Sequence, residues 1–342
     1  MEINTVSIIG LGALGILFGK QLKDNMGEEK VRIIANKDRI ERYKKDKIYC
    51  NNEQTDFYYV DEEEKSEPAD LVIFCVKYGA LDSAISAMHN QIGNSTIILS
   101  ALNGISSEEQ LEEAFGKEKI LYCVAQGMDP VKTGNHLTYT HKGMLCFGEK
   151  DGNVDSPKVR RVSQFFDKVN FSYEVVPNMY KRMWSKLMLN VGVNQTVALS
   201  FGNYGTIQKE GEERDYMISA MREVMALAPY VDIELTEADL NYWLDILDTL
   251  SPEGQPSMRQ DMGARVKSEV GLFAGTVIKL GKKYGVDTPV NQKFYDLINE
   301  VEASYDSQGV IDEYGSIIGD SDGPTAIFVG LGNAQREKSN EN

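Results

Sequence analysis

Three polar side chains interrupt an otherwise apolar stretch that runs from Trp184 to Asn194. Lys186, Asn190 and Asn194 are spaced four residues apart, so a helix would carry all three on one face. The residues between them are almost all apolar, which indicates a helix that is buried nearly all round. Burial of an unpaired ammonium or amide is costly, so this line of polar groups favours a bound ligand. The alternative is a helix face whose polar groups hydrogen-bond to each other.

A second chemical signal lies at the start of the chain, where a short apolar strand, residues 6–9, leads into Gly10-x-Gly12-x-x-Gly15. In this pattern the first glycine allows a tight turn, the second lets the backbone approach a pyrophosphate, and the third lets a helix pack closely on the strand. The helix N-terminus then offers N–H groups to phosphates. The pattern predicts a dinucleotide site, with a purely structural glycine turn as the alternative. The residues expected to contact the cofactor are Gly10, Leu11, Gly12, Ala13, Leu14 and Gly15.

The end of the next predicted strand, residues 31–35, should contact the adenosine ribose of the dinucleotide. An acidic residue there binds the 2′-hydroxyl of NAD, whereas nearby cations accommodate the 2′-phosphate of NADP. The chain has Asn36, Lys37, Asp38 and Arg39 at this point, so NADP is favoured and Asp38 leaves NAD open. The alternative is a helix capped by Asp38 with two solvated basic residues.

Two further strand ends carry polar groups. Lys77 ends the apolar run 70–76, and Asn103-Gly104 follows the strand predicted over residues 95–102. Ligands of open α/β sheets bind outside the carboxyl ends of the strands, so both residues are candidates for cofactor or substrate contacts. A lysine that extends into solvent and a simple Asn-Gly turn are the structural alternatives.

These candidates sit on a chain that alternates strands and helices up to about residue 177, which predicts a doubly wound sheet. We expect a hairpin and an acidic loop over residues 49–68, and an antiparallel hairpin formed by residues 136–140 and 144–148. A strand at 119–125, a helix at 156–169 and a strand at 171–176 complete the predicted domain. Residues 178–305 show helical periodicity and predict an all-α domain, and residues 306–342 form an extension of uncertain order.

A second constellation in the helical half repeats every four residues: Ser257, Asp261, Arg265 and Glu269. This spacing predicts one helix face, on which Asp261 and Arg265 would form an ion pair. Ser257 with Gln260 also fits a capping box, which would give Ser257 a structural role.

Composition excludes several classes of partner. The chain has 342 residues and a net charge of −16, which argues against nucleic acid and an anionic membrane surface. The widely spaced cysteines Cys50, Cys75, Cys123 and Cys146 indicate buried free thiols in a reducing compartment. Three histidines, none at ligand spacing, make a zinc site unexpected. With no signal peptide and no apolar run of membrane length, we expect a cytoplasmic protein.

Over about residues 5–305 the chain resembles the ketopantoate reductase family. The resemblance rests on the Gly10–Gly15 turn, Val76-Lys77, Asn103-Gly104, Trp184-x-Lys186 with Asn190 and Asn194, Ser257 with Asp261 and Glu269, and the string from Gly285 to Pro289. It implies an NADP-binding Rossmann domain, an all-helical second domain and a substrate cleft between them.

The resemblance also implies roles for individual residues. Lys186 would be the general acid, and Glu269 would lie near this lysine and the cofactor. The substrate would be held by Asn103, Asn190, Asn194 and Ser257. Two positions depart from the family pattern: Asn36 stands where the family usually has arginine, and Tyr204 stands where a further substrate-contacting asparagine is expected.

The expected activity is therefore the NADPH-dependent reduction of 2-dehydropantoate (ketopantoate) to pantoate. The substrate would be a small anionic 2-keto acid, and a homodimer is possible because helical second domains often carry dimer contacts. Two alternatives stay open at this point. The chain could reduce a different 2-keto acid or act as an opine-type dehydrogenase, or it could be a non-catalytic NADP-binding regulator.

Overall fold

A computed structural model of the chain describes residues 2–305, which divide into two compact units between Met183 and Trp184. The first unit is α/β and the second is helical, which confirms the predicted fold class. The division falls inside helix α6 (Met179–Leu199), a few residues beyond the boundary predicted at residue 177. The predicted C-terminal extension, residues 306–342, lies outside the described residues.

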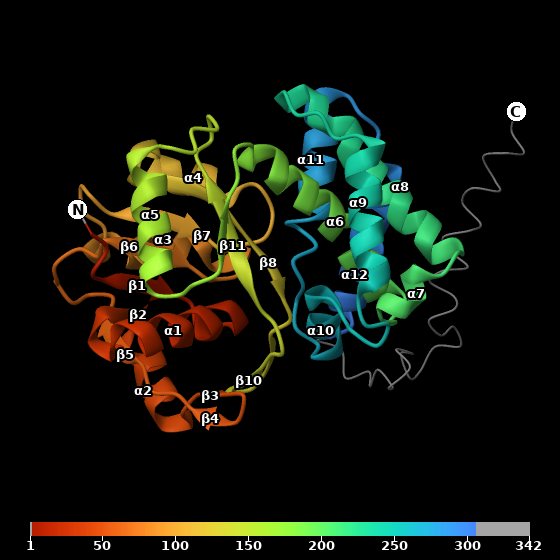
Figure 1. Cartoon of the computed structure of the whole chain (residues 1–342). Helices are drawn as coiled ribbons and strands as arrows, with labels where there is room; N and C mark the ends of the chain where they lie inside the picture. Colours follow the sequence, from red (N-terminus) through yellow and green to blue (C-terminus); the bar gives the residue numbers. More distant parts are fainter. Residues whose placement is uncertain (1, 306–342) are drawn as a thin grey trace, which may run out of the picture. The chain divides into compact units, whose positions relative to one another are not determined.

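The first unit is built on an eight-stranded sheet (Figure 1). All neighbouring strands in it run parallel except β8 and β11, which are antiparallel. Central strands β1, β6 and β7 are buried at every residue, which explains why their sequences are nearly continuous apolar runs. In spatial order the strands are β12 (Tyr173–Val175), β11 (Lys142–Gly148), β8 (Ile120–Met128), β7 (Ile97–Ser100), β6 (Leu71–Phe74), β1 (Val6–Ile9), β2 (Val31–Ala35) and β5 (Tyr58–Asp61).

Helices cover both faces of this sheet. α1 (Ala13–Met26) and α5 (Pro157–Lys168) share one apolar cluster, in which the rings of Phe18 and Phe171 meet edge to face at 5.6 Å. On the other face, Phe115 at the end of α4 (Ser107–Phe115) lies 6.3 Å from Phe74 of β6. α3 (Leu81–Ala87) packs beside α4, and α2 (Lys37–Asp46) follows β2.

A small second sheet corrects one sequence prediction. Its strands are, in order, β4 (Glu53–Gln54), β3 (Tyr49–Cys50), β10 (His136–Thr138) and β9 (Val131–Thr133). The β3–β4 hairpin expected near residue 49 is present, but the hairpin predicted between residues 136–140 and 144–148 is wrong. Strand β10 pairs with β9 and β3, whereas β11 pairs with β8 and β12. The reason is that β8 extends to Met128, so β11 pairs with it from Tyr122 to Met128 and Lys142 belongs to the strand instead of a turn.

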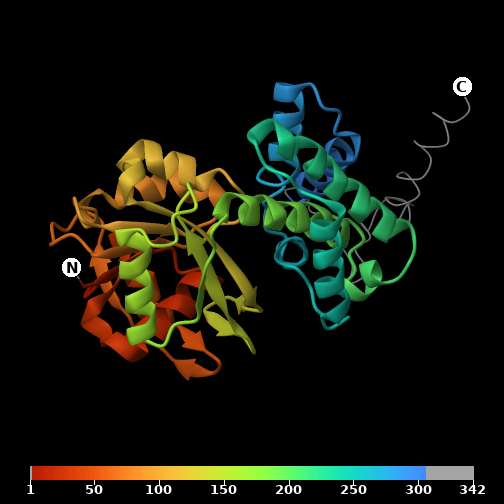
Figure 2. The same cartoon turned by 45° about the horizontal axis from the view of Figure 1, so that its top comes forward.

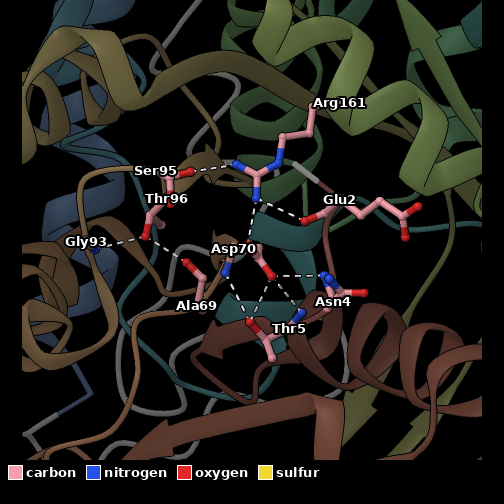
Figure 3. Close-up of polar contacts among 9 residues, drawn as sticks. All are labelled: Glu2, Asn4, Thr5, Ala69, Asp70, Gly93, Ser95, Thr96 and Arg161. Carbon is pink, nitrogen blue, oxygen red and sulfur yellow. Dashed lines mark hydrogen bonds and ion pairs between the residues drawn. The ribbon is translucent and has the colours of Figure 1, made fainter.

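A polar network closes the end of the sheet where β1, β6 and β7 begin (Figure 3). Arg161 of α5 donates to Asp70 Oδ1 at 2.6 Å and to the carbonyl oxygen of Ser95 at 2.7 Å. The other carboxylate oxygen of Asp70 accepts from the backbone N–H groups of Asn4 (2.9 Å) and Thr5 (3.2 Å). One helix and three strand starts are thereby joined at the edge opposite to the strand ends that carry the candidate residues.

The second unit contains helices and no strand within residues 184–305 (Figure 2). After α6 come α7 (Tyr204–Gln208), α8 (Glu212–Leu227), α9 (Glu237–Thr249), α10 (Ser257–Gly263), α11 (Ala274–Tyr284) and α12 (Pro289–Ala303). Gly192 lets α6 approach α8 closely, because a Cβ there would lie 2.5 Å from Met221 Cγ.

Buried hydrogen bonds then join α6 to two other helices. Gln195 Oε1 accepts from the backbone N–H of Ala274 at 3.1 Å, and its Nε2 donates to Asn291 Oδ1 at 3.3 Å.

None of the helices within residues 2–305 combines the length and the apolar character that crossing a membrane requires.

Candidate active site

The glycine-rich turn after β1 has the shape that a phosphate site needs. Gly10 has a φ of 96°, and a Cβ on it would lie 2.5 Å from the carbonyl oxygen of Cys75. A Cβ on Gly15 would lie 1.8 Å from the carbonyl oxygen of Gly10, so the start of α1 can pack here only with glycine. Gly12 differs, because a Cβ there meets nothing closer than 3.8 Å and the residue is exposed. The packing of the chain therefore leaves this position open, as expected where a ligand approaches the backbone.

The remaining residues of the turn surround this open position. Leu11 is buried, whereas Ala13 and Leu14 are partly buried in the first turn of α1. Gly12 is the N-cap of α1 and supplies no side-chain cap, so the helix N-terminus remains available to a phosphate. These residues fit the pyrophosphate of a dinucleotide.

The structure brings the predicted strand-end residues to one edge of the sheet. Strand β1 pairs with β6, and β6 pairs with β7, all in parallel register. Lys77 follows β6 and is exposed at the start of the short helix η2 (Tyr78–Ala80). Asn103 follows β7 and is partly buried, next to Gly104 with a φ of 90°. The chain turns to opposite sides from β1, so these residues lie at the switch point where α/β sheets bind ligands.

Asn36 and Lys37 lie at the end of β2, beside β1. Asn36, and not Asp38, caps α2: its Oδ1 accepts from the backbone N–H of Arg39 at 3.0 Å. The helix begins earlier than a cap at Asp38 would require, which leaves Asp38 in the first turn. Exposed Lys37 lies 3.8 Å from Asp61 Oδ2. Burial raises the pKa of nearby Glu62 and the charge of Asp61 raises it further, while Arg39 opposes both. The end of β2, where the sequence predicts a contact with the adenosine ribose, therefore has both positively and negatively charged side chains.

In the second unit the predicted line of polar residues lies on α6. A single helix from Met179 to Leu199 carries Lys186, Asn190 and Asn194 at one-turn intervals. Lys186 is partly buried, and the side chains of Asn190 and Asn194 are only 9% and 7% exposed. Asn190 Nδ2 is buried and has no hydrogen-bond partner among the described residues. A folded chain tolerates such a donor at a cost, so this face fits a polar ligand that would accept from it.

The four-residue periodicity predicted from Ser257 to Glu269 is wrong. Helix α10 ends at Gly263, and Arg265 beyond it has a φ of 52°, so Ser257 and Glu269 do not share a helix face. Arg265 donates to the carbonyl oxygens of Ser304 (3.3 Å) and Tyr305 (3.2 Å), at the end of α12. The four-residue spacing implies a shared face only within one continuous helix, and this helix ends at a glycine.

The capping box predicted for Ser257 is also wrong. Pro256 occupies the N-cap position, so Ser257 is the first residue of α10, and it is exposed. Gln260 Nε2 donates to the carbonyl oxygen of Gln255 at 3.0 Å, outside the capping-box pattern. The hydroxyl of Ser257 is therefore not used as a helix cap.

A contact that sequence reasoning missed fixes the segment around Glu269. Buried Glu302 of α12 accepts through Oε1 from the backbone N–H of Ser268 at 2.8 Å and from its hydroxyl at 2.5 Å. Glu269 itself is partly buried, and its carbonyl oxygen accepts from the N–H of Leu272 at 2.9 Å. No spacing rule links residues 34 positions apart, and the available signal was only that Glu302 falls on the apolar face of α12.

Tyr204, the second departure from the family pattern, begins helix α7. Asn203 and Thr206 form a capping box there, and the backbone N–H of Tyr204 donates to the carbonyl oxygen of Gly254 at 2.9 Å. Burial raises the pKa of the Tyr204 hydroxyl. A partly buried tyrosine thus occupies the position where the resemblance implies an amide.

Within residues 2–305, no group of three or more His, Cys, Asp and Glu side chains could hold a metal ion. All four cysteines are buried and free, which confirms the prediction of buried thiols.

Comparisons with known proteins cover both units. Residues 6–152 match the family described as "Ketopantoate reductase PanE/ApbA", and residues 178–302 match "Ketopantoate reductase PanE/ApbA C terminal". The chain is 23% identical to the 2-dehydropantoate 2-reductase of Aquifex aeolicus, over 86% of this chain and 96% of that protein. It is 25% identical to the corresponding enzyme of Archaeoglobus fulgidus, over 89% of this chain and 99% of that protein.

Solved structures show the same fold. A PanE/ApbA family ketopantoate reductase from Ralstonia eutropha aligns with a TM-score of 0.75 at 22% identity, covering 88% of this chain and 99% of that one. A D-mandelate dehydrogenase, solved with NADH and anilino(oxo)acetate, aligns with a TM-score of 0.78 at 20% identity and the same coverage. Because the two family matches together span most of the chain, the protein belongs to the ketopantoate reductase PanE/ApbA family of oxidoreductases.

Proposed function

We propose that this protein reduces 2-dehydropantoate to pantoate, a step of pantothenate biosynthesis, with NADPH as the reductant. The observation that carries the proposal is the polar face of α6, where Lys186 lies one turn from the buried, unpaired Nδ2 of Asn190. Relatives named 2-dehydropantoate 2-reductase that align over 96–99% of their own length support the choice of substrate.

The cofactor would be held mainly by residues of the first unit, with Glu269 of the second. The turn from Gly10 to Gly15 would bind the pyrophosphate, and Asn36 with Lys37 would contact the adenosine ribose and its phosphate. Lys77, Asn103 and Glu269 would complete the contacts. Lys37 and Arg39 favour the 2′-phosphate of NADP, although Asp61 and Glu62 lie beside them.

The reaction requires a hydride at the keto carbon and a proton at the keto oxygen. When bound, a nicotinamide cofactor supplies the hydride. Lys186 would donate the proton and stabilise the negative charge that develops on the oxygen. Asn103, Asn190, Asn194 and Ser257 would hold the carboxylate and hydroxyl groups of the substrate, so that the carbonyl is oriented for attack.

A turnover assay with 2-dehydropantoate, run in parallel with NADPH and NADH, tests the proposal. We expect NADPH oxidation that depends on the keto acid, with a higher kcat/KM than for NADH. Absence of turnover with either cofactor would refute 2-dehydropantoate as the substrate. A preference for NADH would refute only the choice of NADPH as the cofactor.

A second candidate function is the reduction of a different 2-keto acid. It is favoured by Tyr204, which replaces an expected asparagine, and by the fold shared with D-mandelate dehydrogenase. A higher kcat/KM for an aromatic or branched 2-keto acid than for 2-dehydropantoate would select this alternative.

We also propose that the protein forms a homodimer. The support is a dimeric ketopantoate reductase from Staphylococcus aureus, whose structure aligns with a TM-score of 0.72 at 20% identity and covers 88% of this chain and 99% of that one. Light scattering after size-exclusion chromatography would measure a mass of about twice the 38.2 kDa of one chain.

A further inference from the structure

A chain of hydrogen bonds connects the segment that carries Asn103 to a buried carboxylate on α4. The backbone N–H of Leu102 donates to Ser100 Oγ at 3.4 Å, and Ser100 Oγ lies 2.8 Å from Ser107 Oγ. Ser107 Oγ in turn donates to Glu108 Oε2 at 2.8 Å. Ser100, Ser107 and Glu108 are at most 1% exposed, so water does not compete for these bonds.

The direction of this chain follows from the number of protons available. A hydroxyl has one proton, and Ser107 gives its own to the ionised carboxylate of Glu108, so in that state Ser107 must accept from Ser100. Ser100 then accepts from the N–H of Leu102, the residue directly before Asn103. Every donor therefore points toward the Glu108 carboxylate, and each bond polarises the next.

Residues 102–105, which include Asn103, form none of the regular backbone hydrogen bonds of a strand or helix. Hydrogen bonds from side chains can therefore fix their position. The N–H of Ala101 still donates to the carbonyl oxygen of Phe74 at 2.9 Å, but residues 102–106 belong to neither strand nor helix. Gly104, with a φ of 90°, adds a backbone conformation that most residues avoid. Asn103 is therefore held in place by the hydrogen bonds that flank it.

We propose that Glu108 is a positioning residue, which acts through Ser107 and Ser100 to hold Asn103 for contact with the keto acid and the nicotinamide cofactor. This inference rests on the proposed function, in which Asn103 makes those contacts. Glu108 is fully buried and touches neither ligand in that proposal, so its effect would be exerted through the segment alone.

Burial allows the carboxylate of Glu108 to titrate near neutral pH. Burial raises the pKa of Glu108 to about 7, the hydrogen bond from Ser107 lowers it, and the charge of Glu112 raises it. From β8, Tyr122 faces the same region, and its pKa is raised by burial and by Glu112. Cys123 of β8 contributes a backbone hydrogen bond that lowers the pKa of Glu108.

Among the described residues, the charged groups of the neighbouring elements α3 and η4 (Lys117–Lys119) are exposed except Lys119, whose side chain is 15% exposed and is paired with Glu118. On α3, Asp82 is exposed, and on η4 Lys117 and Glu118 are exposed, with Lys119 Nζ 2.6 Å from Glu118 Oε1. As the pH rises through about 7, the hydrogen-bond chain gains a full negative charge at its accepting end.

The test compares wild type with Glu108→Gln and Glu109→Gln at pH 6 and pH 8. The amide in Glu108→Gln would keep the shape of the protonated acid but cannot ionise, and Glu109 is its exposed neighbour on the same helix. Three quantities are measured: amide hydrogen exchange of residues 101–106, the Kd of NADPH, and the KM for 2-dehydropantoate. Exchange is compared between variants at the same pH.

At pH 8 we expect faster exchange in Glu108→Gln and an increase of about tenfold in Kd and KM, because a small displacement of a binding group weakens binding strongly. At pH 6 wild type and Glu108→Gln should converge, and Glu109→Gln should follow wild type at both pH values. Ser107→Ala should loosen the segment in the same way at pH 8, which provides a second variant that removes only one hydroxyl.

Exchange and NADPH affinity equal to wild type in both Glu108→Gln and Ser107→Ala at pH 8 would overturn the inference, even if the enzyme turns over. Wild type that binds NADPH but does not reduce 2-dehydropantoate would refute the proposed substrate instead, and exchange and Kd would still decide the role of Glu108.

Discussion

Asn190 and Gln195 are two buried amides on the same helix, and they differ in how their hydrogen bonds are satisfied. Gln195 Nε2 donates to the carbonyl oxygen of Val191 at 2.7 Å, and its Oε1 accepts from Ala274. Asn190 Nδ2 has no partner among the described residues, although its side chain is almost as buried. Gln195 thus stabilises the fold, whereas the unpaired Nδ2 of Asn190 is the donor that the proposed substrate would satisfy.

This difference predicts opposite effects of two similar substitutions. Asn190→Leu should change the free energy of unfolding by less than about 1 kcal/mol, because it removes an unsatisfied donor. Its KM for the keto acid should rise by about tenfold or more, since a buried hydrogen bond to the substrate is lost. Gln195→Met should destabilise by about 2–4 kcal/mol because it leaves Ala274 N–H and Asn291 without their partner. Urea unfolding and steady-state kinetics measure both; a strong loss of stability in Asn190→Leu would contradict the ligand interpretation.

Lys186 is the residue on which the proposed chemistry depends. Lys186→Ala should lower kcat by about 10²–10⁴-fold, the usual contribution of general acid catalysis, and leave the Kd of NADPH unchanged. Stopped-flow reduction and fluorescence titration measure these two quantities. Lys181→Ala, on the first turn of the same helix, is the control and should keep wild-type kcat. Unchanged turnover in Lys186→Ala would remove the residue from the mechanism.

At the scale of elements, α12 anchors the segment that carries Glu269, a candidate site residue, through Glu302. Glu302→Ala removes two hydrogen bonds to Ser268, directly before Glu269. We expect a loss of about 1–3 kcal/mol in stability and a fall in kcat/KM, because the Glu269 segment would lose its anchor. Glu300→Ala, at an exposed position of the same helix, should change neither. A normal kcat/KM in a destabilised Glu302→Ala would show that Glu269 does not depend on this anchor.

The network at the opposite edge of the sheet should affect stability alone. Arg161→Met leaves the partly buried Asp70 carboxylate without its cation and should destabilise the protein by about 1–3 kcal/mol. Arg160→Met, which removes an exposed pair with Asp155, should cost less than about 0.5 kcal/mol. Thermal unfolding measures both effects. Equal melting temperatures for the two variants would contradict the structural role assigned to Arg161.

The sequence predicted those elements whose pattern is local. Strands β1, β6 and β7 are apolar at nearly every position, and α6 is apolar around its line of polar residues, so each was visible in a single stretch of chain. Pairing between distant segments was not visible: β10 joins β3, which lies far earlier in the chain, in place of its neighbour β11. The prediction of one helix face from Ser257 to Glu269 failed because residue spacing does not show where a helix ends, and α10 ends at Gly263.

The candidate site shows the same division. Gly10, Lys77 and Asn103 were predicted from strand ends, and the sheet places those ends side by side. The buried carboxylates Glu302, which accepts from Ser268, and Glu108, which accepts from Ser107, have no motif, because a buried carboxylate is recognisable only from its three-dimensional partners.

For the whole molecule, Glu108 makes stability depend on pH. Its pKa is raised to about 7 in the folded chain, whereas an unfolded carboxyl ionises near its ordinary value of 4.5. Between these values the folded state binds more protons, so stability falls as the pH rises, by up to about 3 kcal/mol. Glu108→Gln does not titrate, so its free energy of unfolding relative to wild type should increase from pH 5 to pH 8. A difference that stays constant over this range in urea unfolding would contradict the assignment.

The four buried cysteines all belong to the first unit, and both tryptophans of the chain, Trp184 and Trp243, belong to the second, where each is at most 3% exposed. The protein therefore carries two built-in reporters. Reaction of the thiols with a coloured disulfide reagent follows the opening of the Rossmann unit, and indole fluorescence follows the opening of the helical one. Coincident transitions in a denaturant titration would show that the units unfold together, and separated ones would give the order in which they come apart, without any introduced label.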